Sequence, residues 1–93
     1  MVLPDDSSTP NWLALPLQTN NRRELLTFLE ENNIQTRVTF SGNITRHPAY
    51  RKYLCEFKNS DIIMKNGFLL GAHHGMDFDD VDYVCDKIKE FLT

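Results

Sequence analysis

Residues 68–72 read FLLGA, a continuous apolar run preceded by Gly67, and this stretch decides the fold. A short apolar run flanked by glycine is typical of a buried strand. A second strand is predicted at residues 12–17, WLALPL, where Pro16 restricts it to a sheet edge or a strand end because proline lacks the N–H donor. A third is predicted at residues 35–40, QTRVTF. Alternation there places three side chains on one half-buried side of the strand: Thr36, Val38 and Phe40.

The clearest helix of the sequence lies in residues 77–92. Asp77 is the predicted N-cap, and Asp79 and Asp80 in the first turn complement the helix dipole. The apolar residues of this segment fall along one helical face, which comprises Phe78, Val81, Val84, Cys85, Ile88 and Phe91.

Three shorter helices are predicted between the strands. The first begins at Asn21 with a predicted capping box to Glu24, and the pair 32–33 ends it. Pro48 suits the first position of a short helix running through Cys55. The third helix covers residues 61–66, with Ser60 as its cap and Gly67 as its stop.

The order of these elements predicts the fold class. Strands and helices interleave without the long regular crossovers of a Rossmann unit. The economical arrangement is an α+β fold with a small three-stranded sheet, antiparallel or mixed, and helices packed on one face.

The composition describes one small domain, since 41% of the 93 residues are hydrophobic and 25% are charged. A formal charge of −3 argues against a nucleic-acid binder, because neutralising phosphates requires a basic face. The basic side chains at 37, 46, 51 and 52 still form a local cluster in the sequence. The chain start lacks a signal-peptide pattern, and no apolar run reaches the roughly 20 residues of a membrane span, so we expect a cytoplasmic protein without membrane contact.

Residues 1–11 contain the polar, proline-bounded stretch PDDSSTP and are predicted to be a linker or an artificial chain start. Residues 12–93 form the predicted domain. Its two cysteines, Cys55 and Cys85, have neither CxxC nor zinc-site spacing and are predicted to be reduced, buried thiols.

Residues 35–50, QTRVTFSGNITRHPAY, form a polar segment of the kind that holds a polar ligand. Arg37 and Arg46 can each offer a planar fork to a phosphate or carboxylate. The imidazole of His47 can donate a hydrogen bond to a ligand oxygen. The alternatives are surface salt bridges for the arginines and a structural role for His47.

Other candidate chemistry is weaker. His73 and His74 are adjacent in an extended segment, point opposite ways and make a poor metal pair, so one is predicted to pack or cap and the other to be solvated. The acidic residues at 77–82 lack the glycine and glutamate of a calcium loop. No nucleophile–base pair, phosphate-binding glycine loop or metal-ligand set is found in the sequence, so we predict neither catalytic nor metal-binding residues.

The run TRVTFSGNITRHPAY, the segment IMKNGFLLGAHHGM and a final DVDYV…IKEFL helix occur in the order typical of one family. From Trp12 to Leu92 the chain resembles the C-terminal small domain of the DegT/DnrJ-type PLP-dependent sugar aminotransferases. It is most similar to the CDP-4-keto-6-deoxyglucose 3-dehydratase branch. His74 stands where the family commonly has proline.

The resemblance implies the small domain of an aspartate-aminotransferase-like enzyme, a homodimer that acts on a nucleotide sugar in deoxysugar or lipopolysaccharide biosynthesis. A large N-terminal domain, absent from this chain, would hold PLP and the catalytic lysine, or the histidine that replaces it in dehydratases. The chain alone would bind no cofactor and catalyse nothing. The positions matching the family's substrate-facing loop are Arg37, Asn43, Arg46, His47 and Tyr50.

Three alternatives remain open. The same segment can belong to a sugar aminotransferase, because the residue that separates the two reactions lies outside it. A free-standing module that binds a nucleotide sugar fits the length and the polar loop. A purely structural domain, with Trp12 and the apolar strands as its interface, is the third.

Overall fold

A computed structural model describes residues 5–9 and 11–93. The elements follow the order β1 (Ala14–Gln18), α1 (Arg22–Glu31), β2 (Thr36–Val38), η1 (Ile44–Arg46), η2 (Pro48–Tyr53), α2 (Lys58–Asn66), β3 (Gly67–Gly71) and α3 (Phe78–Leu92), where η denotes a 3-10 helix. Of the predicted proline-bounded linker, both prolines, at 4 and 10, lie outside the described residues, and the backbone N–H of Ser7 donates to the Asp5 carboxylate within it.

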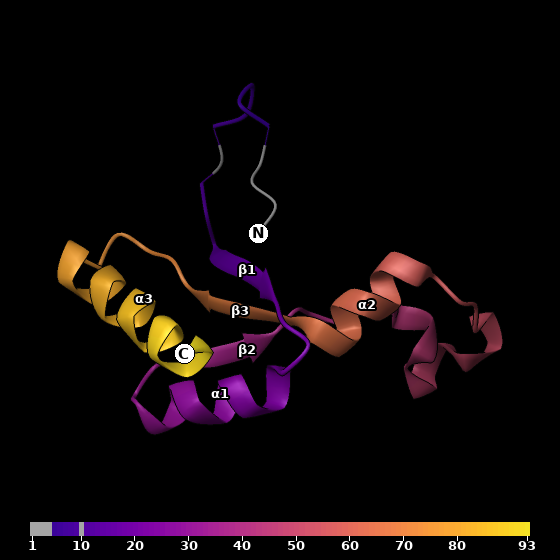
Figure 1. The fold of residues 1–93 in the computed structure, drawn as a ribbon. Coiled ribbons are helices and arrows are strands. Elements are labelled where there is room, and N and C mark those ends of the chain that lie inside the picture. The colour runs from indigo at the N-terminus through magenta and orange to yellow at the C-terminus, as the bar shows by residue number, and fades with distance from the viewer. Residues whose placement is uncertain (1–4, 10) are drawn as a thin grey trace.

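The sheet has three strands in the order β1-β3-β2, and both pairings are antiparallel (Figure 1). The apolar run is therefore the central strand, as its composition predicted, and Pro16 lies on an edge strand, where its missing N–H costs little. The prediction of an α+β fold with a three-stranded sheet is confirmed.

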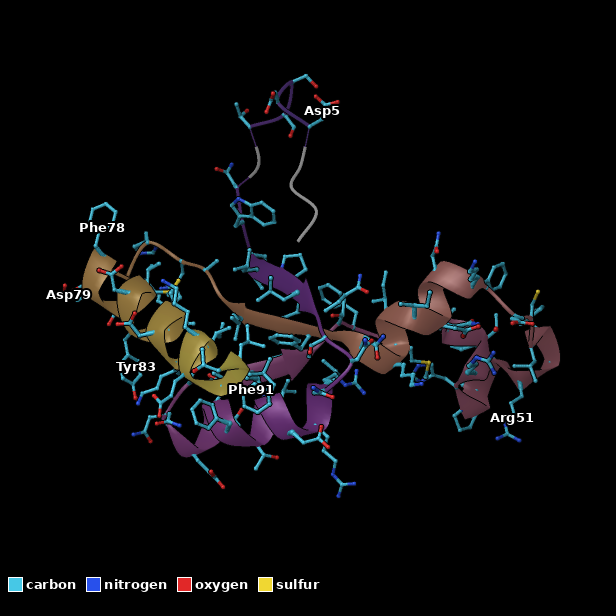
Figure 2. All side chains as sticks on the ribbon, in the orientation of Figure 1. Asp5, Arg51, Phe78, Asp79, Tyr83 and Phe91 are labelled. Atoms are coloured by element: carbon cyan, nitrogen blue, oxygen red, sulfur yellow. The ribbon has the colours of Figure 1, made fainter. Side chains whose placement is uncertain are left out.

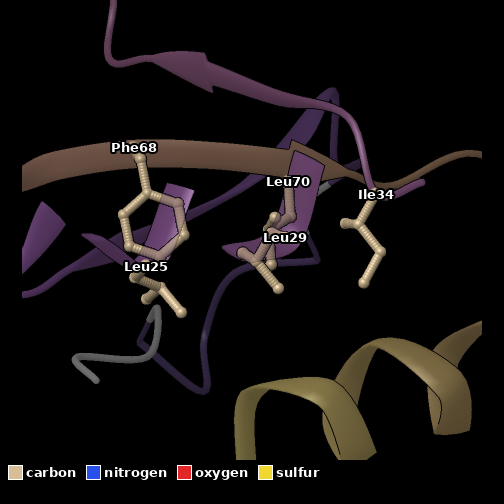
Figure 3. Close-up of a cluster of buried hydrophobic side chains, with 5 residues drawn as sticks. All are labelled: Leu25, Leu29, Ile34, Phe68 and Leu70. Carbon is tan, nitrogen blue, oxygen red and sulfur yellow. The ribbon is translucent and has the colours of Figure 1, made fainter. Parts of the chain in front are cut away.

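The core lies on one face of the sheet, between β3 and α1. Phe68 and Leu70 of β3 pack with Leu25 and Leu29 of α1 and with Ile34 (Figure 3). Helix α3 covers the same side, and partly buried residues of α3 join the core: Val84, Ile88 and Phe91. Helices α1 and α3 thus cover one face, as predicted, and the aromatic rings of Phe28 and Phe91 meet at 5.6 Å between centroids.

Residues 39–66, which we call the arm, project from one end of the sheet (Figure 1). They carry η1, η2 and α2, and none of these elements has a buried apolar side chain. The rest of the described chain, with the sheet, α1 and α3, is called the body. The radius of gyration is 15.2 Å, against about 12 Å for a compact domain of this length. The chain is therefore extended rather than spherical.

The arm joins the body without a linker. Helix α2 ends at Asn66 and β3 begins at Gly67. The guanidinium of Arg22 in α1 donates to the carbonyl oxygens of Met64 at 2.8 Å and Gly67 at 3.1 Å. A Cβ at Gly67 would lie 2.6 Å from the Ile63 carbonyl oxygen, so this junction has no space for a side chain.

The helix ends in the structure can be compared with the predicted caps. Asp77 caps α3 through a reciprocal capping box with Asp80, which confirms the predicted N-cap. The capping box predicted for Asn21 is wrong: its backbone has ψ of 42°, outside the extended region that an N-cap uses, and its side chain makes no cap bond. The predicted end of α1 is confirmed, because Asn33 has φ of 65°.

The cap predicted at Ser60 is also wrong, because α2 begins earlier, at Lys58 with Phe57 as its N-cap. The backbone N–H of Asp61 donates to the Phe57 carbonyl oxygen at 2.8 Å, so the chain is already helical at position 60. The predicted helix start at Pro48 is confirmed.

Several residues predicted to be buried are exposed. Strand β2 ends at Val38, which is 56% exposed, and Phe40 has φ of 46°, which breaks the alternation and turns its ring outward. Phe78 lies at the first position of α3, beyond the sheet, and points into solvent (Figure 2). Cys55 and Cys85 are free thiols, as predicted, but both are exposed: Cys55 lies on the arm, and Cys85 lines the open hollow beside α3.

Candidate functional site

The polar segment of the sequence forms the first half of the arm. Gly42 has φ of +59° and packs directly against Met64 of α2, so a side chain at this position would overlap with Met64. This left-handed turn sends the following residues along α2. Two polar side chains of the loop, Asn43 and Arg46, face one carboxylate of α2, that of Asp61.

Asn43 is the centre of the loop, and it is only 2% exposed. Its side-chain nitrogen donates to the Cys55 carbonyl and to the Asp61 carboxylate, both at 2.9 Å. Its side-chain oxygen accepts the backbone N–H of Thr45 at 3.0 Å and the Thr45 hydroxyl at 2.6 Å. A side-chain amide has two N–H donors and two acceptor positions, and all are used here. Asn43 is thus fully engaged inside the arm.

Arg46 forms a two-pronged ion pair with Asp61, with Nε–Oδ1 at 2.5 Å and Nη2–Oδ2 at 3.0 Å. The Arg46 guanidinium and the Asn43 amide hold the pKa of the Asp61 carboxyl well below its usual range, and the Phe57 N–H adds to the effect. Asp61 in turn raises the pKa of Arg46. The salt-bridge alternative for this arginine is the arrangement observed.

His47 is half-buried, and its Nε2 lies 2.7 Å from the Ser41 carbonyl oxygen. Because a carbonyl only accepts, Nε2 carries the proton, and in the neutral ring Nδ1 remains an acceptor. No other hydrogen bond of the His47 side chain occurs within residues 5–9 and 11–93. This nitrogen is therefore available to a ligand donor.

The remaining predicted residues lie apart from this network. Tyr50 is in η2 and 46% exposed. Arg37 is in β2 opposite Leu69, so it projects from the sheet face away from Phe68 and the core. The pKa of Glu30 is lowered mainly by the Thr36 backbone N–H and hydroxyl, and the Arg37 charge adds to the effect. The structure thus brings together Asn43, Arg46 and His47, places Tyr50 on the adjoining helix and leaves Arg37 on the sheet.

Sequence reasoning missed Asp61 as a member of this site and assigned it only to a helix. One signal was present: residues 39–66 contain five basic residues but only two carboxylates, Glu56 and Asp61. An arginine loop with so few acids nearby requires a specific counter-charge. Arg51 and Lys52 form the exposed basic end of the arm, where Arg51 points away from the fold (Figure 2) and the Lys52 ammonium lies 5.0 Å from the Tyr53 ring centre.

Apart from the polar network of the arm, an open hollow lies on the body, between α3 and strands β1 and β3. It encloses about 980 Å³, and its lining is mainly apolar and includes Trp12, Leu15, Leu17, Met76, Val84 and Ile88. His73 lies at its rim, where its Nδ1 accepts the Gly75 N–H, and His74 is exposed. His73 is exposed as well, so the predicted contrast is limited to hydrogen bonding: His73 accepts within a local turn, and His74 is solvated.

The described residues do not assemble a PLP site. PLP needs a grip on its phosphate, a partner for its ring nitrogen and a positioned acid–base group. In the part of the chain that the structure describes, the buried polar side chain is Asn43, which has no free donor or acceptor. Four of its lysines are exposed, and Lys87 is paired with Glu90. The same residues contain no cluster of three potential metal ligands and no helix long and apolar enough to cross a membrane.

The same fold occurs in a solved structure. A crystal structure of S. venezuelae DesV in complex with a ketimine intermediate superimposes with a TM-score of 0.76, at 17% sequence identity, over 84% of this chain and 22% of that one. At this identity the match establishes the fold alone.

The family follows from the sequence. The model of the DegT/DnrJ/EryC1/StrS aminotransferase family matches residues 1–89, and the chain belongs to this family. It is 36% identical to a dTDP-4-dehydro-2,6-dideoxy-D-glucose 3-dehydratase of Saccharopolyspora spinosa over 92% of the chain. It is 37% identical to the lipopolysaccharide biosynthesis protein RfbH of Salmonella typhimurium over 94% of the chain. The chain spans only 21% and 22% of these relatives' lengths.

Proposed function

We propose that this chain is the C-terminal, substrate-closing domain of a PLP-dependent nucleotide-sugar 3-dehydratase in deoxysugar or lipopolysaccharide biosynthesis, and that it is not catalytic alone. The observation that carries the proposal is the pair of relatives matched over more than nine tenths of the chain, one named a 3-dehydratase and the other a lipopolysaccharide biosynthesis protein. Both are several times longer than the matched region.

In this proposal the missing large domain holds PLP, since the described residues offer no site for it. PLP supplies an electron sink for the sugar chemistry. The complete enzyme is a cytoplasmic homodimer. The role of the present chain is to bind and orient the sugar nucleotide and to exclude water when the domains close.

The arm, together with Arg37 of strand β2 in the body, is the proposed substrate-facing element. Arg37 and the free N–H groups of Arg46 donate hydrogen bonds to the diphosphate. In the neutral ring, Nδ1 of His47 accepts a hydrogen bond from a sugar hydroxyl, and Tyr50 lies beside the ligand. Asn43 contributes by holding the loop, because its own atoms are engaged.

The reading frame upstream of Met1 tests the proposal most directly. An in-frame domain that supplies the rest of the relatives' length, with histidine in place of the PLP-binding lysine, is the expected result. A lysine at that position would replace the dehydratase with the aminotransferase, which is the second candidate because the family description names aminotransferases. A start codon with no coding sequence before it would overturn the domain proposal.

Binding measurements distinguish the proposed domain from the remaining alternative, a free-standing binding module. A free-standing binding module should bind a dTDP- or CDP-linked 4-keto sugar by calorimetry as the 93-residue chain, with an affinity unaffected by any large domain. The proposed domain should bind weakly alone, because a closing element supplies only part of the contact surface.

The apolar hollow beside α3 gives an independent test. We propose that the large domain covers this surface, since its lining is mainly apolar and apolar surface is stabilised by burial against a partner. The 93-residue chain should therefore bind an apolar dye such as ANS, and Leu15→Ser with Trp12→Ser should reduce the fluorescence. Leu54→Ser, which changes an exposed leucine of the arm, is the matched control. Equal signals from all variants would contradict the covering role.

A further inference from the structure

We infer that Asp61 is the positioning residue of the arm, which fixes the ligand-facing loop in one geometry before the sugar nucleotide binds. This inference rests on the proposed function of the arm. It assigns a role to a residue that touches no ligand in the proposal and acts through Asn43 and Arg46.

Donors from three residues meet at one carboxylate. Oδ1 accepts from Arg46 Nε at 2.5 Å and from Asn43 Nδ2 at 2.9 Å, and Oδ2 accepts from Arg46 Nη2 at 3.0 Å and from the Phe57 backbone N–H at 3.2 Å. The donors are separated from Asp61 by 15, 18 and 4 residues along the chain. One side chain therefore closes the loop onto the first turn of α2.

The arm depends on this closure because none of its described residues has a buried apolar side chain. The buried apolar residues of the described chain all belong to the body, and the buried side chain of the arm is Asn43. An isolated surface ion pair contributes little. Here the same carboxylate also satisfies a buried amide, and losing a partner of a buried donor is costly. Asp61 thus differs from the partner of an ordinary surface salt bridge.

The consequence is a preorganised loop. With Asn43 fixed through Asp61, the turn at Thr45 and the following 3-10 helices are fixed as well, because the Asn43 oxygen holds the Thr45 N–H and hydroxyl and its nitrogen holds Cys55. The free Nδ1 of His47 is then presented at a constant position. Ordering a loop before binding lowers the entropic cost of binding.

The test compares Asp61→Asn with Glu56→Gln in the 93-residue chain. Both changes remove one negative charge from the arm, but Glu56 is exposed and makes no side-chain hydrogen bond or ion pair with a described residue. The first readout is amide hydrogen exchange. Asp61→Asn is expected to accelerate exchange at Thr45 and Phe57 about tenfold or more, with Phe68 and Leu70 of the body unchanged, whereas Glu56→Gln leaves all four unchanged.

The second readout is the affinity for dTDP, used as a probe of the proposed diphosphate contact. Asp61→Asn is expected to weaken binding about tenfold, Glu56→Gln to leave it near the wild-type value, and Asp61→Glu to recover part of the loss. If Asp61→Asn unfolds the whole chain, the Asp61→Glu variant supplies both readouts, with smaller changes in the same directions.

The outcomes separate this inference from the proposed function. Unchanged exchange in the arm overturns the role of Asp61, whatever the affinity. Faster exchange with unchanged affinity also overturns it, because Asp61 would then be structural only. Faster exchange in a chain whose wild-type form does not bind dTDP confirms that Asp61 holds the arm and overturns the diphosphate contact.

Discussion

The body and the arm of this chain are ordered by different forces. In the body, Phe68 and Leu29 are almost completely buried, and helices α1 and α3 close over one face of the sheet (Figure 3). In the arm, large apolar side chains such as Tyr53 and Leu54 are exposed, and hydrogen bonds to Asn43 and Asp61 supply the order. Apolar burial tolerates changes of pH, whereas a network centred on one carboxylate does not. The two regions should therefore fail separately.

The largest expected effect is in the body. Leu29→Ala removes the most buried leucine of the core, at 0% exposure, and should lower the free energy of unfolding by about 2–5 kcal/mol. Urea denaturation followed by far-UV circular dichroism measures it. Leu54→Ala in the arm is the matched control and should cost less than about 0.5 kcal/mol, since Leu54 is 57% exposed. Equal losses would mean that the arm has a core of its own.

The next effect is confined to the arm. Gly42→Ala places a side chain at a left-handed position against Met64 and should cost about 1–3 kcal/mol, detected as local loss of amide protection around Thr45. Gly71→Ala is the control, because its Cβ would meet only the Met76 sulfur at 3.8 Å, an ordinary contact. Loss of protection at Phe68 in the first variant would contradict the separation of the two regions.

A smaller effect is expected at the N-terminus of α3. Asp77→Ala removes the N-cap of the capping box and should lower stability by about 1 kcal/mol. Asp82→Ala removes an equal charge from the same helix without a capping role and should change stability by less than about 0.5 kcal/mol. Thermal unfolding followed at 222 nm compares them. Identical melting curves would show that the capping box contributes nothing.

The smallest expected effect is the response of the arm to acid, because Asp61 stays ionised at neutral pH and loses its charge only at low pH. The pKa of Asp61 is lower in the folded chain than its ordinary value of about 3.9, so the folded state favours the ionised form. Its contribution to stability is present above that ordinary value and is lost as the pH falls from about 4 toward the folded pKa. NMR spectra from pH 7 to pH 2 should show the amides of Thr45 and Phe57 shifting before those of Phe68 and Leu70.

The control for this titration comes from the body. Glu30 also has a lowered pKa, because its carboxylate accepts the Thr36 N–H, but there the core supplies most of the order. Acid should therefore alter the shift of Thr36 without loosening α1. If the amide signals of the arm and the body changed together in one transition, the two regions would unfold as a single unit.

The sequence predicted the body well because its signals are local. The apolar run of β3, the proline of β1 and the capping box at Asp77 each act within a few residues. Asn21 failed as a cap because Arg22 binds carbonyls more than 40 residues away, and such tertiary anchoring leaves no local trace. The strand pattern failed at Phe40 because a left-handed residue ended the alternation.

The candidate site was predicted only in outline. Its loop was identified from composition, but composition does not show which polar atoms are already engaged. Asn43 and Arg46 were expected to face a ligand, and the structure shows them turned toward Asp61. That pairing joins residues far apart in the chain, so neither spacing nor periodicity could predict it.

The direct junction between α2 and β3 has a mechanical consequence. Since Asn66 ends the helix and Gly67 begins the central strand, and since Arg22 donates to carbonyls on both sides of this step, α2 continues into β3 without a hinge. A displacement of the arm tip must rotate β3, and with it the two strands paired to it (Figure 1). We therefore expect α2 and the sheet to move together as one rigid unit, rather than the arm moving while the sheet stays fixed.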